Sequence, residues 1–252
     1  MQSPFLARLL MAALLVAVSG ASGAVEITVS AASSLTNAFK DVAQSYQAHY
    51  PEAKVALNFG ASGALLQQMA KGAPVDVFAS ADQETMDMAE KQGLVAASAR
   101  RNFVRNSLVL IQPADSQRPL TRLKDLVQPG IKRVALGNPA SVPVGRYTRQ
   151  ALEAAHLWEA VQAKAINTQN VRQSLDYVAR GEVDAGFVYG TDAVLMADKV
   201  RVAFEVPLDS AIRYPLAATR ASTNSAEAQR FVAFVLSPAG QAILSRYGFR
   251  QP

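Results

Sequence analysis

The stretch SGALLQQMAKGAPVDVFAS (residues 62–80) carries the pattern on which the fold prediction rests. Apolar residues at helical spacing stop just before Gly72, and glycine readily takes the left-handed conformation that ends a helix. A short apolar run follows, as expected for a buried strand. Residues 171–190, VRQSLDYVARGEVDAGFVYG, repeat this plan with Gly181 at the helix end. Any α/β protein can repeat such units, and two similar lobes facing each other across a cleft would show the same echo.

Further apolar runs extend this pattern along the chain. Between most of them lie segments with apolar residues at helical spacing, of which residues 34–49 are the clearest. Asn224 and Glu227 resemble a capping box that opens a C-terminal helix, and Pro238 is expected to split that region into two helices. Strands that alternate with helices predict a mostly parallel α/β architecture. The predicted strands are 26–30, 54–59, 76–80, 107–112, 133–137, 184–190, 201–206 and 214–219.

Residues 1–24 have the features of a secretory signal peptide. Arg8 precedes an apolar run, and the small residues of SGASGA (residues 19–24) follow it. The apolar run is too short to span a membrane. Cleavage after Ala24 fits best, with Ala21 and Gly23 as alternatives. We therefore expect a soluble, exported protein located in the periplasm.

Composition narrows the chemistry that such a protein can perform. The chain has no cysteine, which excludes disulfides, thiolate metal sites and a cysteine nucleophile. The formal net charge is +5, a mild positive balance that would attract anions without identifying one. Residues 100–105 hold three arginines, but the cluster is short and lies in an exported chain. We interpret it as solvated surface and expect no nucleic-acid partner.

The search for catalytic and metal-binding patterns finds little. Ser62 lies in GASGA, whose glycine spacing differs from the G-x-S-x-G turn of hydrolases. His49 and His156 are the only histidines, and each stands alone in a helical pattern. Two isolated histidines make neither a zinc site nor a catalytic triad. We therefore predict no catalytic residue, no direct cation site and no cofactor.

Neutral groups at helix starts are the remaining candidates for function. Ser34 and Ser62 each follow a strand and precede a helix, and Val144 and Val171 fall just inside two further helix starts. Serine at such a position ordinarily caps its own helix. The alternative is anion binding, because the first N–H groups of a helix are unpaired and carry partial positive charge.

Several motifs together resemble the periplasmic molybdate-binding proteins of ATP-driven importers. The resemblance covers nearly all of residues 25–250 and runs in order. The motifs that carry it are AASSLTNAFKDVA (31–43), GAPVDVFASADQ (72–83), NSLVLI (106–111), LGNPASVPVGRYTRQAL (136–152), FVYGTDA (187–193) and RYGF (246–249). The fold implied is the type II periplasmic-binding-protein fold, with two lobes that each contain a mixed, mostly parallel sheet flanked by helices. The implied lobes are residues 25–104 plus 197–252, and residues 105–196, with the ligand cleft between them.

The resemblance also implies a ligand site made of neutral donors. Ser34 and Ser62 would contribute hydroxyls from the first lobe, Val144 and Val171 backbone N–H groups from the second, and Tyr189 its hydroxyl. Two features depart from the family pattern. Valine stands at position 144, where alanine is frequent, and this could narrow the pocket. The loop around Ser62 lacks the neighbouring serines that relatives can have, which affects fine selectivity.

The sequence therefore predicts a monomeric solute-binding protein that captures molybdate, and tungstate as well, and delivers it to the inner-membrane permease of an ABC importer. A binding protein for sulfate or another tetrahedral oxyanion is the closest alternative. An exported serine hydrolase using Ser34 or Ser62 is an alternative from another class, and it would need a base near the serine. A transcription regulator with the same lobes is disfavoured by the signal peptide and by the lack of a helix-turn-helix segment.

Overall fold

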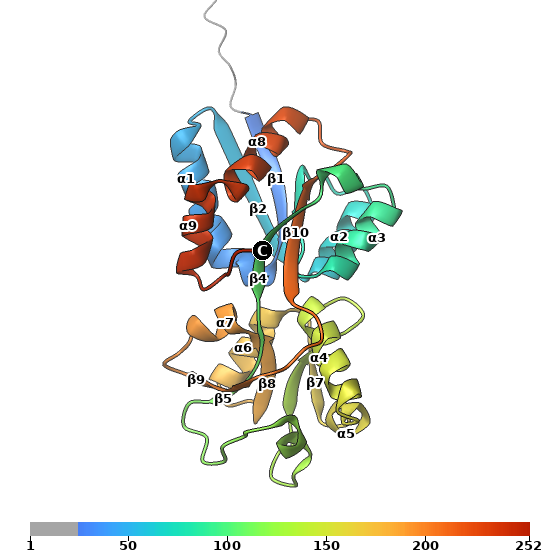
Figure 1. Cartoon of the computed structure of the whole chain (residues 1–252), viewed down its shortest axis with the longest axis vertical. Coiled ribbons are helices and arrows are strands. Elements are labelled where there is room, and N and C mark those ends of the chain that lie inside the picture. Colours follow the sequence, from blue (N-terminus) through green and yellow to red (C-terminus); the bar gives the residue numbers. More distant parts are fainter. Residues whose placement is uncertain (1–24) are drawn as a thin grey trace, which may run out of the picture.

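The chain forms two sheets, one in each lobe, and the lobes lie one beyond the other along the long axis of the molecule (Figure 1). The computed structural model describes residues 25–252, so the predicted signal peptide, residues 1–24, lies outside the described part. The first sheet has the strand order β2-β1-β3-β10-β4 and the second the order β7-β6-β8-β5-β9. The strands of the first sheet are β1 (Val25–Ala32), β2 (Ala53–Gly60), β3 (Val77–Ala79), β4 (Arg101–Asn106) and β10 (Ile212–Ala218). Those of the second are β5 (Leu108–Pro113), β6 (Val134–Gly137), β7 (Ala165–Thr168), β8 (Ala185–Tyr189) and β9 (Val200–Glu205).

The two sheets share one plan. Three parallel strands come first, and the fourth strand in order is antiparallel to both of its neighbours. That fourth strand enters from the opposite lobe: β5 follows β4 through the single residue Ser107, and β10 follows β9. The echoed sequence units form α2 with β3 and α6 with β8, which hold equivalent places in the two sheets. The two-lobe interpretation of the echo is therefore confirmed.

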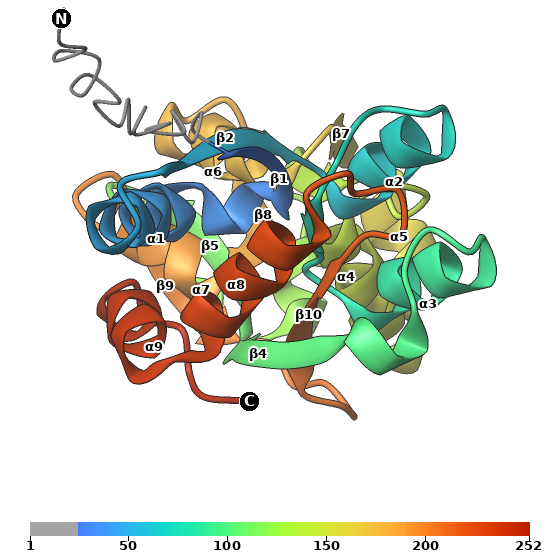
Figure 2. The same ribbon diagram turned by 90° about the horizontal axis from the view of Figure 1, so that it is seen from above.

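Helices cover both faces of each sheet. Figure 2 shows α1, α8 and α9 on one face of the first sheet and α2 and α3 on the other. The helices of the first lobe are α1 (Thr36–His49), α2 (Ser62–Ala70), α3 (Gln83–Lys91), α8 (Ser225–Leu236) and α9 (Pro238–Arg246), with the short 3-10 turns η1 (Ser33–Leu35) and η2 (Ala97–Ala99). Those of the second are α4 (Pro143–Ala154), α5 (Trp158–Gln162), α6 (Val171–Ala179) and α7 (Gly190–Val194), with η3 (Leu123–Val127).

Aromatic side chains join helices to the first sheet. Phe39 of α1 is fully buried, and its ring lies edge-on to Phe103 of β4, with ring centroids 5.8 Å apart. Phe231 of α8 packs edge-on against the ring of Phe39 as well, with ring centroids 6.4 Å apart. Edge-to-face pairs of this kind are favoured by the ring quadrupoles. They join α1, α8 and the sheet into one hydrophobic core.

All eight predicted strands are present, and two strands were missed. β7 has only four residues, two of them exposed, so its sequence carries no alternating pattern. β4 overlaps the arginine cluster of residues 100–105, for which the sequence predicts solvated surface. Arg101 is exposed as expected, but Phe103 and Val104 are buried, so the segment is an edge strand.

Two other expectations need correction. Strand β9 pairs with β5 of the second sheet, whereas the predicted boundary placed residues 197–205 in the first lobe. We revise the proposed lobes to residues 25–106 plus 212–252, and residues 108–205. The predicted capping box is wrong as well: the Asn224 side chain donates to the carbonyl of Glu26 and does not cap α8. The split at Pro238 is confirmed, with the Ser237 hydroxyl capping α9.

We predict that Gly72→Ala and Gly181→Ala each destabilise the protein through backbone strain alone. Gly72 and Gly181 have φ of +90° and +68°, and a Cβ at either position would meet no atom within 4 Å. The left-handed conformation costs an L-residue about 1–2 kcal/mol, so each melting temperature should fall by about 2–8 °C. The exposed neighbour Glu182→Ala is the control. Melting temperatures equal to that of the parent protein would contradict this role for the two glycines.

Candidate functional site

A small cavity between the two lobes brings together all five residues predicted for the site. Ser34, Ser62, Val144, Val171 and Tyr189 line it, and each is at most 4% exposed. The remaining lining comes from Ala32, Ser33, Gly60, Ala61, Ala81, Val142 and Pro143. The cavity is small, about 10 Å³. The lobes are thus close together at this point and leave no room for a sugar.

Helix N-termini point at this cavity from both lobes. Ser62 and Val171 are the first residues of α2 and α6, and Val144 is the second residue of α4, after Pro143. The Asn170 side chain caps α6 by accepting from the N–H of Gln173, which leaves the N–H of Val171 without that cap. Unpaired N–H groups at the positive ends of several helix dipoles favour an anion in the shared space.

The two serine hydroxyls each contact one further polar group. The N–H of Ala81 donates to Ser62 Oγ at 3.0 Å, so the hydroxyl proton of Ser62 remains free to donate. Ser34 Oγ lies 3.0 Å from the hydroxyl of Tyr214 on β10. The ordinary interpretation of Ser34 as a helix cap is wrong, because Ser34 sits inside η1 and its side chain makes no capping bond.

Tyr189 ends β8 with its hydroxyl unpaired. The side chain is 1% exposed and its oxygen has no hydrogen-bond partner among the described residues. Burial raises the pKa of Tyr189 well above its ordinary value, so the hydroxyl keeps its proton at neutral pH. A buried hydroxyl without a partner is costly unless a ligand supplies the acceptor.

None of the cavity-lining residues is charged. The groups that face the cavity are hydroxyls and backbone N–H groups, and the acceptor side of the Ser62 hydroxyl is already occupied. An arrangement of this kind can stabilise a negative charge by donated hydrogen bonds. It offers neither a base to activate a nucleophile nor carboxylates to coordinate a cation.

Several polar contacts join the lobes beside the cavity, and the sequence did not predict them. The N–H of Gly63 donates to the carbonyl of Ser141 at 3.0 Å. Arg146 of α4 pairs with Asp82 at 2.6 Å across the cleft, and both side chains are largely buried. Arg172 of α6 donates to the carbonyl of Ser34 at 3.2 Å. Arg172 is the second residue of α6 and Arg146 the fourth residue of α4, and no local sequence pattern indicates their partners in the other lobe.

The carboxyl of Asp192 is buried behind the site. It is 0% exposed, and its Oδ1 lies 2.7 Å from Nε of Arg172, an ionic contact whose direction is poor for a hydrogen bond. Its Oδ2 accepts a long bond from the N–H of Tyr189. Burial raises the pKa of Asp192 to about 6, although Arg172 opposes the shift.

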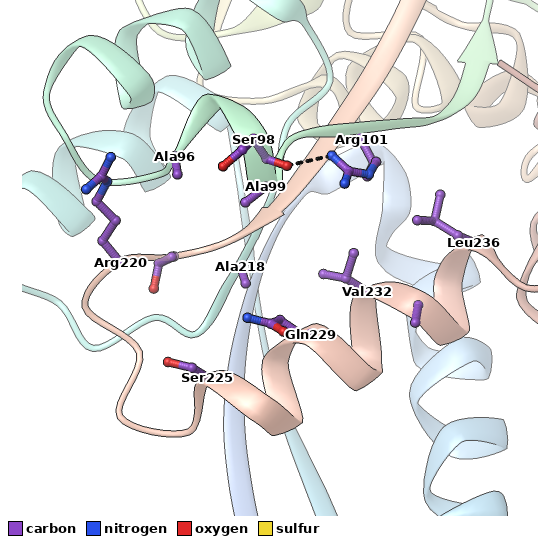
Figure 3. A pocket seen from close by; sticks show the side chains of 12 residues that line it. Ala96, Ser98, Ala99, Arg101, Ala218, Arg220, Ser225, Gln229, Val232 and Leu236 are labelled. Atoms are coloured by element: carbon purple, nitrogen blue, oxygen red, sulfur yellow. Dashed lines mark hydrogen bonds between the residues drawn. The ribbon is translucent and has the colours of Figure 1, made fainter.

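Other candidate features lie away from this cavity. Neither His49 nor His156 lines it. Within residues 25–252 no three His, Cys, Asp or Glu side chains are grouped to hold a metal ion, and no helix is long and apolar enough to cross a membrane. A wider groove of about 590 Å³ lies on the first lobe between α8 and η2, rimmed by Arg101 and Arg220 (Figure 3). It contains none of the predicted site residues.

Comparisons with known proteins agree with this architecture. The family described as bacterial extracellular solute-binding protein matches residues 27–250. The molybdate-binding protein ModA of Escherichia coli (strain K12) is 36% identical over 94% of this chain and 95% of its own length. The substrate-binding domain of a putative molybdenum ABC transporter from Clostridium difficile is 35% identical, with a TM-score of 0.68 over 90% of this chain and 99% of that domain. The sulfate-binding protein SubI of Mycobacterium tuberculosis H37Rv has a TM-score of 0.78 at 19% identity over 90% of this chain and 87% of its own, which shows a shared fold alone.

We predict that Gly63→Ala hinders closure of the lobes. A methyl group at this position would stand 2.6 Å from the carbonyl oxygen of Ser141, a backbone atom that cannot swing away. A ligand held by donors of both lobes should bind at least about tenfold more weakly, and molybdate, the ligand named for the relatives, is the probe. Titration calorimetry measures the affinity, and X-ray scattering should show less compaction on adding molybdate. The exposed neighbour Ala64→Ser is the control, and a Gly63→Ala variant with parental affinity would contradict this prediction.

We also predict that Asp192 makes stability depend on pH. The folded protein holds the Asp192 proton more tightly than the unfolded chain, where the pKa is near its ordinary 3.8. The contribution of this group is therefore fully present below about pH 4, falls as the pH rises, and is constant above about pH 6. Denaturation without oxyanion should show the parent losing about 2 kcal/mol relative to Asp192→Asn between pH 4 and 7. A stability difference that does not change with pH would contradict this.

Proposed function

The chain belongs to the family of bacterial extracellular solute-binding proteins, among the relatives of the molybdate-binding protein ModA, and from this membership we propose that it captures molybdate, and tungstate as well. Ser34, Ser62 and Tyr189 contribute hydroxyl donors to the anion, and Val144 and Val171 contribute backbone N–H groups. The protein acts in the periplasm as a monomer and hands its ligand to the inner-membrane permease of an ABC importer.

The observation that carries this proposal is a closed cavity lined by uncharged donors. A dianion loses a large hydration free energy on burial, and fixed hydrogen-bond donors can replace that hydration. Because the Ser62 hydroxyl already accepts from Ala81, its proton is available to the ligand. Phosphate is partly protonated near neutral pH and would bring a proton that needs an acceptor. Molybdate, tungstate and sulfate bring none, so the cavity favours them over phosphate.

Sulfate is the second candidate, because it uses the same donors. Discrimination then rests on size alone, since molybdate and tungstate are larger than sulfate. Val144 is 1% exposed and its side chain helps to set the width of the cavity. The serine-hydrolase alternative has less support: Ser34 and Ser62 contact a tyrosine hydroxyl and a backbone N–H, and neither His49 nor His156 lines the cavity.

Delivery follows from closure. The Arg146–Asp82 pair and the Gly63–Ser141 hydrogen bond link the two lobes, so they form only when the lobes are together. A ligand that adds contacts to both lobes shifts the protein toward this closed form. The permease would recognise the closed form and release the anion on opening it.

Thermal unfolding with molybdate, tungstate, sulfate or phosphate tests the proposal on mature protein that has been refolded to remove bound ligand. At a thousandfold excess over its dissociation constant a ligand adds about 4 kcal/mol, or roughly 8–16 °C in melting temperature. Molybdate and tungstate should give such a shift and phosphate should not. A shift with sulfate alone would replace the ligand, and no shift with any oxyanion would reject the function.

Ser34→Ala and Ser62→Ala should each weaken molybdate binding by about 10- to 150-fold, the worth of one hydrogen bond to a charged ligand. Titration calorimetry compares them with Ser98→Ala, an exposed serine of η2 outside the cavity. Parental affinity in both cavity variants would remove these hydroxyls from the site.

A further inference from the structure

A chain of hydrogen bonds runs from the crossing between the lobes to the hydroxyl of Ser34. Asn106 is the last residue of β4, beside the crossing residue Ser107. Its Nδ2 lies 3.2 Å from the hydroxyl oxygen of Tyr214, which in turn lies 3.0 Å from Ser34 Oγ. Tyr214 is fully buried, and neither it nor Asn106 lines the cavity.

The orientation of the Asn106 amide follows from its neighbours. The backbone N–H of Ser107 lies 3.0 Å from Oδ1, and a backbone N–H can only donate. The N–H of Thr191 approaches the same oxygen at 3.5 Å. The oxygen of the amide must therefore face these groups, which turns Nδ2 toward Tyr214 and toward the Thr191 hydroxyl, 2.9 Å away.

This orientation sets the direction of every later bond. An amide NH₂ can only donate, so the Tyr214 oxygen accepts from Asn106. Among the described residues Ser34 Oγ is the other partner of this hydroxyl, and it is therefore the acceptor for the tyrosine proton. The Ser34 oxygen is then an acceptor toward Tyr214, and its proton is free to point into the cavity. Burial raises the pKa of Tyr214 well above its ordinary value, which keeps the tyrosine proton in place.

We propose that Asn106 and Tyr214 are positioning residues that hold Ser34 as a hydrogen-bond donor and so select ligands without a proton. The inference rests on the proposed function, because it describes how the same site distinguishes oxyanions. Ser62 reaches the same state by a shorter route, since the N–H of Ala81 occupies its acceptor side. The hydroxyls of Ser34 and Ser62 are thus both held as donors to the cavity. In each case the bonding pattern begins at a nitrogen that can only donate, the Asn106 amide for Ser34 and the Ala81 N–H for Ser62.

Two isosteric variants test whether the hydrogen bonds from Asn106 through Tyr214 to Ser34, here called the relay, act on the ligand by more than packing. Tyr214→Phe removes the donor to Ser34, whose hydroxyl can then rotate, and molybdate should bind about 3- to 10-fold more weakly. Asn106→Asp reverses the relay: the carboxylate accepts the Tyr214 proton, Tyr214 accepts from Ser34, and Ser34 turns a lone pair toward the anion. Molybdate should then bind about 10- to 100-fold more weakly.

Asn106→Asp also adds a negative charge, so the experiment is a double-mutant cycle measured by titration calorimetry. In a Tyr214→Phe background the aspartate has no tyrosine proton to accept, and its cost should fall to about threefold or less. Equal weakening by Asn106→Asp in both backgrounds would show an effect of charge alone and would overturn the relay. Tyr46→Phe, the same change in a buried tyrosine bonded to Glu227, is the matched control and should keep parental affinity.

The preference for sulfate over hydrogenphosphate gives a second test, because a purely structural role of Asn106 and Tyr214 would leave this preference unchanged. Sulfate and hydrogenphosphate are nearly equal in size but differ by one proton, and competition against molybdate compares them. Both variants should reduce the preference for sulfate over hydrogenphosphate by about tenfold, because Ser34 can then accept a ligand proton. An unchanged preference in both variants would overturn the proposal.

Melting temperatures of the variants without ligand show whether each one is folded. Should Tyr214→Phe not fold, the preference between sulfate and hydrogenphosphate in Asn106→Asp decides the question. If the parent protein binds sulfate and not molybdate, the double-mutant cycle is measured with sulfate as the ligand, and the same changes in affinity are expected. A parent protein that binds none of the three anions overturns the proposed function and the relay together. A parent protein that binds an anion, with variants whose affinity and preference equal those of the parent, overturns the relay alone.

Discussion

For the proposed function, the constraint on which the rest depends is the burial of negative charge without a positive side chain beside it. Removing a dianion from water is expensive, and partial charges on several fixed donors must replace its hydration. One helix start would supply too few of them. Helix N-termini from two lobes, together with buried hydroxyls, put enough donors around one small space. The five proposed donor residues come from five separate elements and line one cavity, as this requirement predicts: Ser34, Ser62, Val144, Val171 and Tyr189.

The shared plan of the two sheets explains how the donors meet. In parallel α/β units each helix begins beyond the carboxyl end of a strand, so helix starts gather at one edge of a sheet. Two sheets that face each other with these edges enclose donors from both sides. The strands that cross between lobes, β5 and β10, join each sheet at the fourth position and connect the site directly to the crossing. Tyr214 lies on one of these strands and contacts both Asn106 at the crossing and Ser34 in the cavity.

The charged groups near the cavity lie just outside it, where they join protein to protein. Arg146 is paired with Asp82, and Arg172 with the Ser34 carbonyl and Asp192. The Arg146–Asp82 pair and the bond from Arg172 to the Ser34 carbonyl link the two lobes. The neutral groups are left to face the cavity. A guanidinium in direct contact with the anion would bind any dianion strongly and would discriminate less by proton content.

The sequence by itself determined the α/β class, eight of the ten strands, the echoed helix–strand units and the positions of the helix starts. Hydrophobic periodicity and the residues that begin and end helices depend on neighbouring positions in the chain, so the sequence alone is enough to predict these features. Only the tertiary structure decided that Ser34 contacts Tyr214 and does not cap its helix, that Asn224 bonds to Glu26, and that β9 belongs to the second sheet. It also decided the pairing of Arg146 with Asp82 and the contacts that connect Asn106, Tyr214 and Ser34. The physical reason is that each of these contacts joins residues distant in the chain, and their partners are chosen by packing that no local pattern records.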